Sequence, residues 1–493
     1  MKKAVRIVAG VVVVVAVAAS AGAWYTGTRL QPVLEASIAQ ANAELAKSMV
    51  DTDRKPIAHI ELASLDRHFF SSTAHYRLVI DGKSLGADEP QLEFLFVDDI
   101  EHGPLPLSRL KALKLMPVMA MSNYRLEPSP AAQGWFDVAK DKSPLFGHVN
   151  IAYDGATDGT LNLLPLDFTG EGGHFSFSGM TVNGTLSADG EKYGLTGVVD
   201  DYRLTGTAPE GDVLVGLKGF TFDTGGTRGA SGFYLGHSDM KLGTVDLQLP
   251  GQPAVKITGT TGTSLMQEVE GKLAVEMAYD IAGINVAAQD VGSARMAWKF
   301  NNFETGATRA LYDLYQTRIA PQQQAATAAG QPFDLKLSDA EQRLLNEQMV
   351  KLLQGKPHVE LQAFTLKTAN GESRLNMAVD LTNPGSIQPG SPQFAQNVIG
   401  KLDAKLLVSK PMLQDVGAVQ ARMQGQTDPA AIAQQGRDLS DTAGAMAQML
   451  QLAKDEGDNI VASLQYADGM VDFNGQKMTV QQFVASMMGR FGG

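Results

Sequence analysis

From residue 57 onward the chain alternates apolar and polar side chains with a period of two. Within 75–81, Tyr76, Leu78 and Ile80 face one way, while Arg77 and Asp81 face the other, and the segment 273–279 repeats the pattern. This is the period of a strand with one apolar face and one polar face. The pattern predicts an α+β fold rich in β structure: a long, twisted, mostly antiparallel sheet with helices packed on its apolar face.

A helical period replaces the alternation elsewhere in the chain. Ser338 with Glu341, and Thr479 with Gln482, are capping pairs that predict helix starts. The Ala- and Gln-rich segment from 411 onward carries an apolar stripe, which is suited to a core or to pairing with another helix. The stripe is made of Leu439, Ala443, Met446 and Leu450.

An interruption of the strand pattern lies near 105–126. Leu110, Leu113 and Met116 have helical spacing, and Pro117 breaks the run. We expect a short apolar helix that plugs one end of the sheet.

These patterns divide the chain into seven segments. They are 1–28, a cytoplasmic tip and transmembrane anchor; 29–56, a stem helix; 57–302, an extended antiparallel β-region with the helical insert; 303–356, a helical segment; 357–410, strands; 411–456, the Ala- and Gln-rich helical segment; and 457–493, a C-terminal hairpin and helix.

The anchor is predicted from residues 7–28, which carry no charged side chain. As a helix they would span roughly 33 Å, enough for a hydrocarbon core of about 30 Å. Basic residues at positions 2, 3 and 6 favour a cytoplasmic N-terminus. A cleavable signal peptide also fits, but the length of the run and the interfacial pair Trp24-Tyr25 favour a retained anchor. We therefore expect a single-pass protein of the bacterial inner membrane, with most of the chain in the periplasm.

Composition narrows the classes of function. The chain has no cysteine, which excludes disulfides, thiolate nucleophiles and cysteine-based metal sites. Its net charge of −12 argues against a nucleic-acid partner.

Three histidines, His59, His68 and His75, lie close together in the sequence, and Glu61 would share a strand face with His59. A zinc site needs three or four converging ligands, and this spacing matches no ligand motif. We interpret these histidines as separate surface residues.

A second polar group consists of Asp98, Asp99, Glu101 and His102. Paired carboxylates can bind cations or transfer protons, but acidic residues also commonly end a strand before a Gly-Pro break. The glycine-rich stretch 225–232 lacks the Gly-Lys-Ser/Thr ending of a phosphate loop and is interpreted as a hairpin loop. The sequence thus predicts no catalytic, cofactor-binding or metal-binding residues, no cofactor, and a protein that is not an enzyme.

Short motifs are spread along nearly the whole chain. They are Gly22-Ala23-Trp24-Tyr25-Thr26-Gly27, Gln40-Ala41-Asn42-Ala43, Phe70-Ser71-Ser72, His102-Gly103-Pro104 with Pro106-Leu107, Ser463-Leu464-Gln465-Tyr466-Ala467 and Asn474-Gly475-Gln476-Lys477-Met478. Through these motifs the chain resembles one known family, the YdgA-like proteins of Gram-negative bacteria, whose function is unknown. The resemblance implies an inner-membrane-anchored periplasmic protein with self-association as a candidate property, and it supplies no catalytic residues.

Two functions are consistent with the sequence. The first is a non-enzymatic envelope protein that acts by binding or by self-association, with a homodimer as the candidate assembly. The alternative is a lipid-binding or lipid-transfer protein that uses the apolar face of the sheet as a groove for phospholipid. If helices cover that face they favour the first function, whereas an accessible face favours the alternative.

Overall fold

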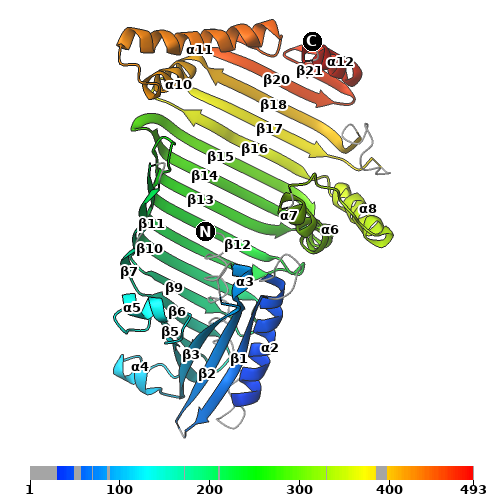
Figure 1. Cartoon of the computed structure of the whole chain (residues 1–493). Helices are drawn as coiled ribbons and strands as arrows, with labels where there is room; N and C mark the ends of the chain where they lie inside the picture. The colour runs from blue at the N-terminus through cyan, green and yellow to red at the C-terminus, as the bar shows by residue number, and fades with distance from the viewer. Residues whose placement is uncertain are drawn as a thin grey trace. The chain divides into compact units, whose positions relative to one another are not determined.

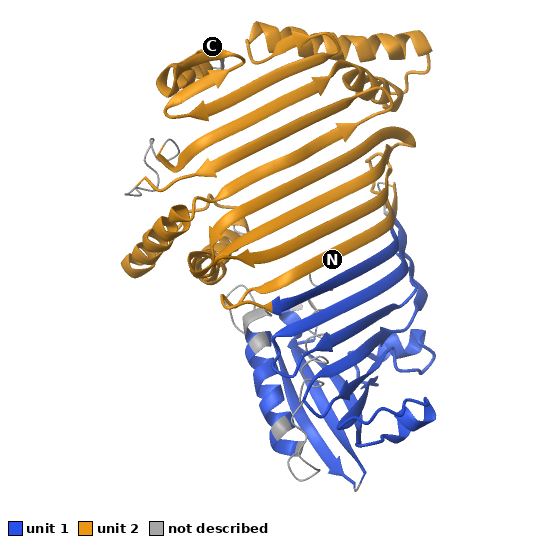
Figure 2. Ribbon diagram, turned by 180° about the vertical axis from the view of Figure 1, so that it is seen from behind, with its two compact units in different colours: residues 1–209, 214–227 blue, residues 210–213, 228–493 orange. Residues whose placement is uncertain are grey.

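The alternating segments of the sequence form antiparallel strands, as the pattern predicts. The computed structural model describes residues 30–48, 57–68, 70–85, 89–170, 172–208, 211–328, 330–384 and 397–491. The chain divides into two compact units, residues 1–209 with 214–227 and residues 210–213 with 228–493 (Figure 2). The predicted anchor, 7–28, lies outside the described residues. Within the described part of the chain, no helix is long and apolar enough to cross a membrane.

The first unit is an antiparallel sheet with one long helix. Its strands pair in the order β1-β2-β3-β4-β5-β6-β9-β10, and the β7–β8 hairpin pairs with the second half of β10. The elements are α2 (Leu30–Ser48), β1 (Ala58–Arg67), β2 (Ser71–Asp81), α3 (Gly82–Leu85), β3 (Gln91–His102), α4 (Leu107–Lys111), β4 (Ala120–Glu127), α5 (Gln133–Val138), β5 (Leu145–Ile151), β6 (Thr157–Leu163), β7 (Leu166–Gly170), β8 (Gly173–Phe177), β9 (Met180–Leu186), β10 (Lys192–Ala208) and β11 (Gly211–Arg228), which has residues in both units.

Helix α2 covers the apolar face of the first unit. Leu34 and Leu45 are buried against that face, and α2 lies along β1 (Figure 1). Asn42 also ties the helix to this strand, because its side chain accepts a hydrogen bond from Ile60 N (2.7 Å) and donates one to Ile60 O (2.9 Å). The core beneath α2 contains Ile60, Leu78, Ile80, Phe96, Ile100 and Leu126, all buried.

The second unit is also an antiparallel sheet, with its helices in three groups. Its strands pair in the order β12-β13-β14-β15-β16-β17-β18-β20-β21-β22, and β19 pairs with β20. The strands are β12 (Tyr234–Gln248), β13 (Val255–Val269), β14 (Lys272–Val286), β15 (Gln289–Glu304), β16 (His358–Lys367), β17 (Glu372–Leu381), β18 (Ile399–Ser409), β19 (Lys454–Glu456), β20 (Asn459–Ala467), β21 (Met470–Phe473) and β22 (Gln476–Thr479). The helices are α6 (Thr305–Leu314), the π-helix η1 (Tyr315–Ile319), α7 (Ala320–Ala328), α8 (Asp339–Gln354), α10 (Lys410–Met423), α11 (Pro429–Met449) and α12 (Val480–Phe491).

Both predicted capping pairs are present. Ser338 and Glu341 form a reciprocal capping box at the start of α8. Thr479 and Gln482 bond each other's backbone N–H groups at the start of α12 (2.9 and 3.3 Å). These helix starts can be predicted from the sequence because a capping pair depends only on residues three positions apart.

The helix predicted near 105–126 is present only in part, as the short helix α4. It ends at Lys111, and residues from Ala120 onward form β4. Leu113 and Met116 are exposed between these elements, so they do not plug the sheet.

The buried side of α11 is not the predicted stripe but a row of mostly small residues, Ile432, Gly436, Ser440 and Gly444. This row lets α10 approach closely: a β-carbon on Gly417 of α10 would lie 2.8 Å from Gly436 Cα. Met446, from the predicted stripe, is exposed. Close backbone approach, rather than large apolar contacts, decides how this helix packs.

Candidate functional site

The second unit carries rows of apolar side chains that lie opposite one another in the strand register. In the first row Tyr279 pairs with Met296, Met296 with Phe364, Phe364 with Leu375, and Leu375 with Leu406. The second row is Met277, Trp298, Leu361, Met377, Ala404 and Leu464, and the third is Val275, Phe300, Val359, Val379, Leu402 and Tyr466. We call these three rows the apolar face.

The apolar face is only partly covered. Tyr279, Phe364 and Leu406 are 41%, 53% and 39% exposed. Within the three rows, all of whose residues are described, Leu361 alone is buried. Under α2 in the first unit, by contrast, the corresponding apolar residues are nearly all buried. The second unit therefore presents apolar side chains that a helix-covered sheet would hide.

The helices of the second unit explain this exposure, because they lie toward the ends of the strands. Helix α6 follows β15 directly and contacts it, and α10 follows β18 directly and contacts it. Since β15 and β18 run in opposite directions, these two helices lie at opposite ends of the strands (Figure 1). The predicted helices are thus present, but they leave the middle of the apolar face accessible.

The opposite face of the same strands is polar. Arg295 Nη1 lies 2.8 Å from Asp280 Oδ1, and Lys299 Nζ lies 2.7 Å from Glu276 Oε1. These cross-strand ion pairs are partly exposed and favour a solvated face. Only one side of the sheet is therefore suited to an apolar ligand.

The size and chemistry of the apolar face limit what it can bind. Strands lie about 4.8 Å apart, so the span from β14 to β20 is roughly 24 Å. This exceeds the roughly 15 Å that one leaflet contributes to a hydrocarbon core of about 30 Å. The rows contain aliphatic and aromatic residues, with Trp298 stacked on Phe300 at 5.9 Å between ring centroids. Such a surface suits extended hydrocarbon chains and offers no charged group to recognise a polar substrate.

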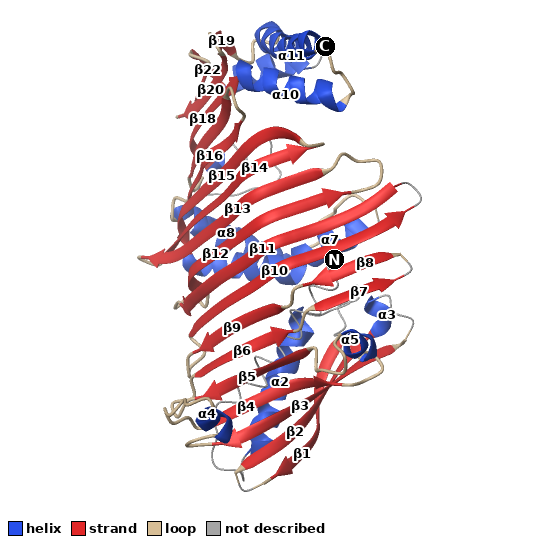
Figure 3. Ribbon diagram, turned by 90° about the vertical axis from the view of Figure 1, so that its left-hand side faces the viewer, coloured by secondary structure: helices blue, strands red, loops and turns tan. Residues whose placement is uncertain are grey.

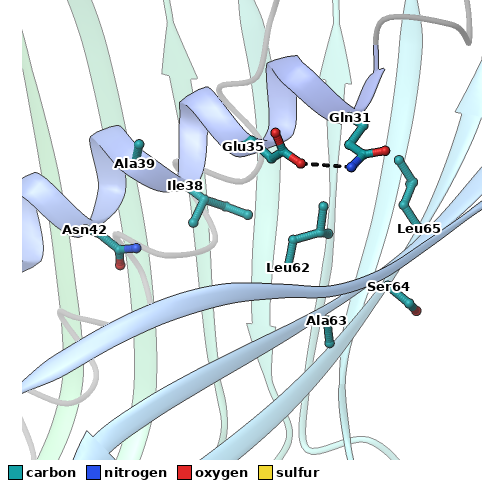
Figure 4. Close-up of a pocket in the computed structure, with 9 residues that line it drawn as sticks. All are labelled: Gln31, Glu35, Ile38, Ala39, Asn42, Leu62, Ala63, Ser64 and Leu65. Carbon is teal, nitrogen blue, oxygen red and sulfur yellow. Dashed lines mark hydrogen bonds between the residues drawn. The ribbon is translucent and has the colours of Figure 1, made fainter.

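A pocket of about 460 Å³ lies in the first unit, between α2 and β1 (Figure 4). Its polar lining residues bond to one another or to the strand: Gln31 Nε2 donates to Glu35 Oε1 (2.9 Å), and Asn42 pairs with the backbone of Ile60. Ile38 and Leu62 supply apolar lining. The Asn42 bonds hold α2 on β1, whereas the Gln31–Glu35 bond lies within the helix. We assign the pocket no chemistry.

Strand alternation separates the predicted acidic group. Asp98 is buried in the core and accepts a hydrogen bond from Ser122 Oγ (2.7 Å). Burial raises the pKa of Asp98 to about 7, and repulsion from Asp99 adds to the shift. Burial, with the nearby Asp98 charge, also raises the pKa of Tyr76. The Tyr76 hydroxyl has no hydrogen-bond partner among the described residues.

The other members of this group have structural partners. Asp99 faces outward and pairs with Arg125. Glu101 Oε2 accepts hydrogen bonds from Ser108 N and Ser108 Oγ (2.8 and 2.9 Å), and His102 Nε2 lies 3.1 Å from Ser72 Oγ. The four side chains do not converge on a shared point.

The early histidines lie apart as well. His59 pairs with Glu61 on the same strand face (3.1 Å), as predicted, whereas His75 pairs with Glu127 (3.2 Å). In the described ranges, no group of three or more metal-ligating side chains is placed to hold a metal ion. The glycine-rich stretch 225–232 ends β11 and forms the turn before β12, where Gly229 N donates to Phe233 O (2.7 Å).

The sequence pattern predicts which residues share the apolar face but not their exposure. Met296, Trp298 and Phe300 occupy every second position, which places them on one face of the strand. No sequence signal distinguishes a covered face from an exposed one, because the alternation is the same whether or not a helix lies above the strand.

Comparison with known proteins places the chain in a family. A family model described as "Bacterial protein of unknown function (DUF945)" matches residues 1–481, so the chain belongs to that family. It is 26% identical to protein YdgA of Escherichia coli over 487 residues, covering 96% of this chain and 95% of YdgA. It is also 26% identical to the uncharacterized E. coli protein YihF over 493 residues, covering 98% of each. The predicted resemblance is confirmed. No solved structure matches the chain.

Proposed function

We propose that this protein is a non-enzymatic protein of the bacterial cell envelope that binds phospholipid acyl chains on the apolar face of its second unit. The observation that carries this proposal is the exposure of Tyr279, Phe364 and Leu406 in one register row. Burying such side chains against an acyl chain would gain about 25 cal/mol for each Å² of apolar surface removed from water.

Acyl-chain binding takes precedence over self-association because the face of the sheet is accessible. The helical segments 303–356 and 411–456 would favour self-association if they covered the sheet. These segments pack toward the strand ends instead, and the accessible face favours lipid binding.

The proposed location is the inner membrane, with a retained single-pass anchor at 7–28, the N-terminus in the cytoplasm and the bulk of the chain in the periplasm. The uncharged apolar run and the preceding basic residues support this location.

Native mass spectrometry tests the proposal. A form of the chain that begins at residue 29 contains every described element and lacks the apolar run. After incubation with phospholipid vesicles and separation from them, we expect masses of the protein with bound phospholipid. A protein that stays lipid-free after this treatment would contradict lipid binding.

Self-association through α11 is a second candidate function, because Met446 and Met449 of this helix are exposed. Ala-rich helices with a narrow apolar stripe pair well with one another. If α11 forms the dimer contact, replacing both methionines by glutamate will convert a dimer into a monomer, as measured by light scattering after size-exclusion chromatography. Ala433→Glu, at an exposed position on the same helix, is the control. A dimer that survives the double replacement would exclude α11 as the contact.

A further inference from the structure

The connection between β3 and β4 in the first unit exposes a dense run of large apolar side chains. We call residues 105–116 the leucine loop; it contains α4 and lies where β3 ends and β4 begins (Figure 3). Leu113 is 84% exposed and Met116 is 76% exposed. The full set of exposed large apolar residues is Leu105, Leu107, Leu110, Leu113, Leu115 and Met116. Scattered surface leucines are ordinary, but such a cluster marks a contact surface.

The backbone of the leucine loop is held in place by buried polar contacts. Arg109 is buried, and its guanidinium donates to Asn150 Oδ1 (2.8 Å) and to Met116 O (3.0 Å), which closes the loop. Glu101 accepts hydrogen bonds from Ser108 at the start of α4. The apolar side chains are therefore presented by an anchored backbone, and their exposure is not the result of a frayed segment.

The charge of this region is opposite to that of the whole chain. The chain has a net charge of −12, yet residues 103–126 contain no aspartate or glutamate. Lys111 and Lys114 are both exposed between the exposed leucines. Apolar side chains interleaved with lysine match the interface of a bilayer with anionic headgroups, where the lysines pair with phosphate and the apolar groups enter the acyl boundary.

We propose that the leucine loop is a membrane-contact element that inserts its leucine and methionine side chains into the surface of a bilayer containing anionic phospholipid. Its place at the strand ends lets it meet a flat surface: β3 ends at His102, β4 begins at Ala120, and Met119 N bonds to Ile151 O, the last residue of β5. This inference does not depend on acyl-chain binding by the second unit, because it concerns a different surface and a different state of the lipid.

A fluorescent label at one position tests the contact in the full chain. Because the chain has no cysteine, Leu113→Cys gives a single labelling site for a polarity-sensitive dye. Vesicles of phosphatidylcholine, with or without about a third phosphatidylglycerol, carry a quencher on the lipid acyl chains. We expect the dye emission to shift to the blue and to be quenched several-fold more strongly with the anionic vesicles.

The control label is placed by Gln133→Cys, at an exposed position in α5. This helix lies between the end of β4 and the start of β5, at the opposite end of these strands from the leucine loop. Both labelled variants keep the apolar N-terminal run. Attachment of the chain to the vesicle through that run alone would therefore affect both labels equally. Adding Lys111→Glu and Lys114→Glu to the Leu113→Cys variant should abolish the preference for anionic vesicles. The proposal is overturned if position 113 behaves like position 133 or if quenching is equal in both vesicles. It is also overturned if the dye becomes shielded without lipid as protein concentration rises, which would indicate contact with a second copy.

Discussion

Leu406→Glu will lower the affinity of the protein for a phospholipid with a fluorescent acyl chain by about tenfold or more. Leu406 is 39% exposed on the apolar face, in register with Leu375. A carboxylate there would have to lose its hydration water against an acyl chain, which is unfavourable. The lost leucine contact adds about 0.6–1.2 kcal/mol, because only the exposed 39% of the side chain remains to be buried by lipid. A tenfold change in affinity corresponds to about 1.4 kcal/mol. Fluorescence titration of the lipid measures this change.

The sheet supplies a matched control for this variant. Leu265 is also 39% exposed, but it lies opposite Glu276 and His237 and therefore on the polar face. Leu265→Glu introduces the same charge at the same exposure, so it should leave lipid affinity within about twofold. Equal losses in both variants would show that the charge acts through general destabilisation and would contradict binding on the apolar face.

Asp98→Asn will stabilise the first unit by about 2–4 kcal/mol above pH 7. Burial raises the pKa of Asp98 from 3.8 to about 7, so the folded state binds a proton more tightly than the unfolded state. The free energy of unfolding should therefore fall as pH rises from about 4 to about 7, by about 4 kcal/mol in total, and then level off. Asparagine removes the buried charge and can still accept from the Asn123 N–H and donate to Ser122 Oγ.

The pH dependence separates this effect from a general change in packing. Amide exchange of peptides covering β3 and β4 should be slower in Asp98→Asn than in the parent chain at pH 8. After correction for intrinsic exchange, the difference should shrink toward pH 4. Asp99→Asn, on the exposed side of the same strand, should change stability by less than about 1 kcal/mol. A difference between Asp98→Asn and the parent chain that does not vary with pH would refute a buried ionised carboxylate.

The strands and helix starts were predictable because their signals are local. Tyr76, Leu78 and Ile80 alternate as a strand requires, and Ser338 with Glu341 specifies the start of α8 within four residues. The leucine loop was not predictable, since it depends on a bond between Arg109 and Asn150. A contact between residues so far apart in the sequence produces no periodic pattern of apolar and polar positions. Leu113 also takes a left-handed φ of 56°, which its neighbours do not signal.

The accessibility of the candidate site is the other feature that sequence could not supply. The rows through Trp298 and Phe364 have the same pattern in a covered sheet and in an open one. What decides between them is where α6 and α10 pack, and this depends on the junctions after Glu304 and Ser409 rather than on the strands themselves. The separation of the acidic residues, by contrast, is already contained in the sequence pattern. The period of two that predicts the strand places Asp98 and Asp99 on different faces.

Photo-crosslinking from the apolar face tests the central claim most directly. A photoreactive phenylalanine analogue at Phe364, in the full chain inside cells, should form covalent adducts with phospholipid acyl chains that mass spectrometry identifies. The same analogue at Leu265 on the polar face should form few. Adducts at Phe364 and not at Leu265 are the result we predict. If the analogue at position 364 forms no lipid adducts, or forms crosslinks to protein instead, the result would contradict lipid binding by the sheet.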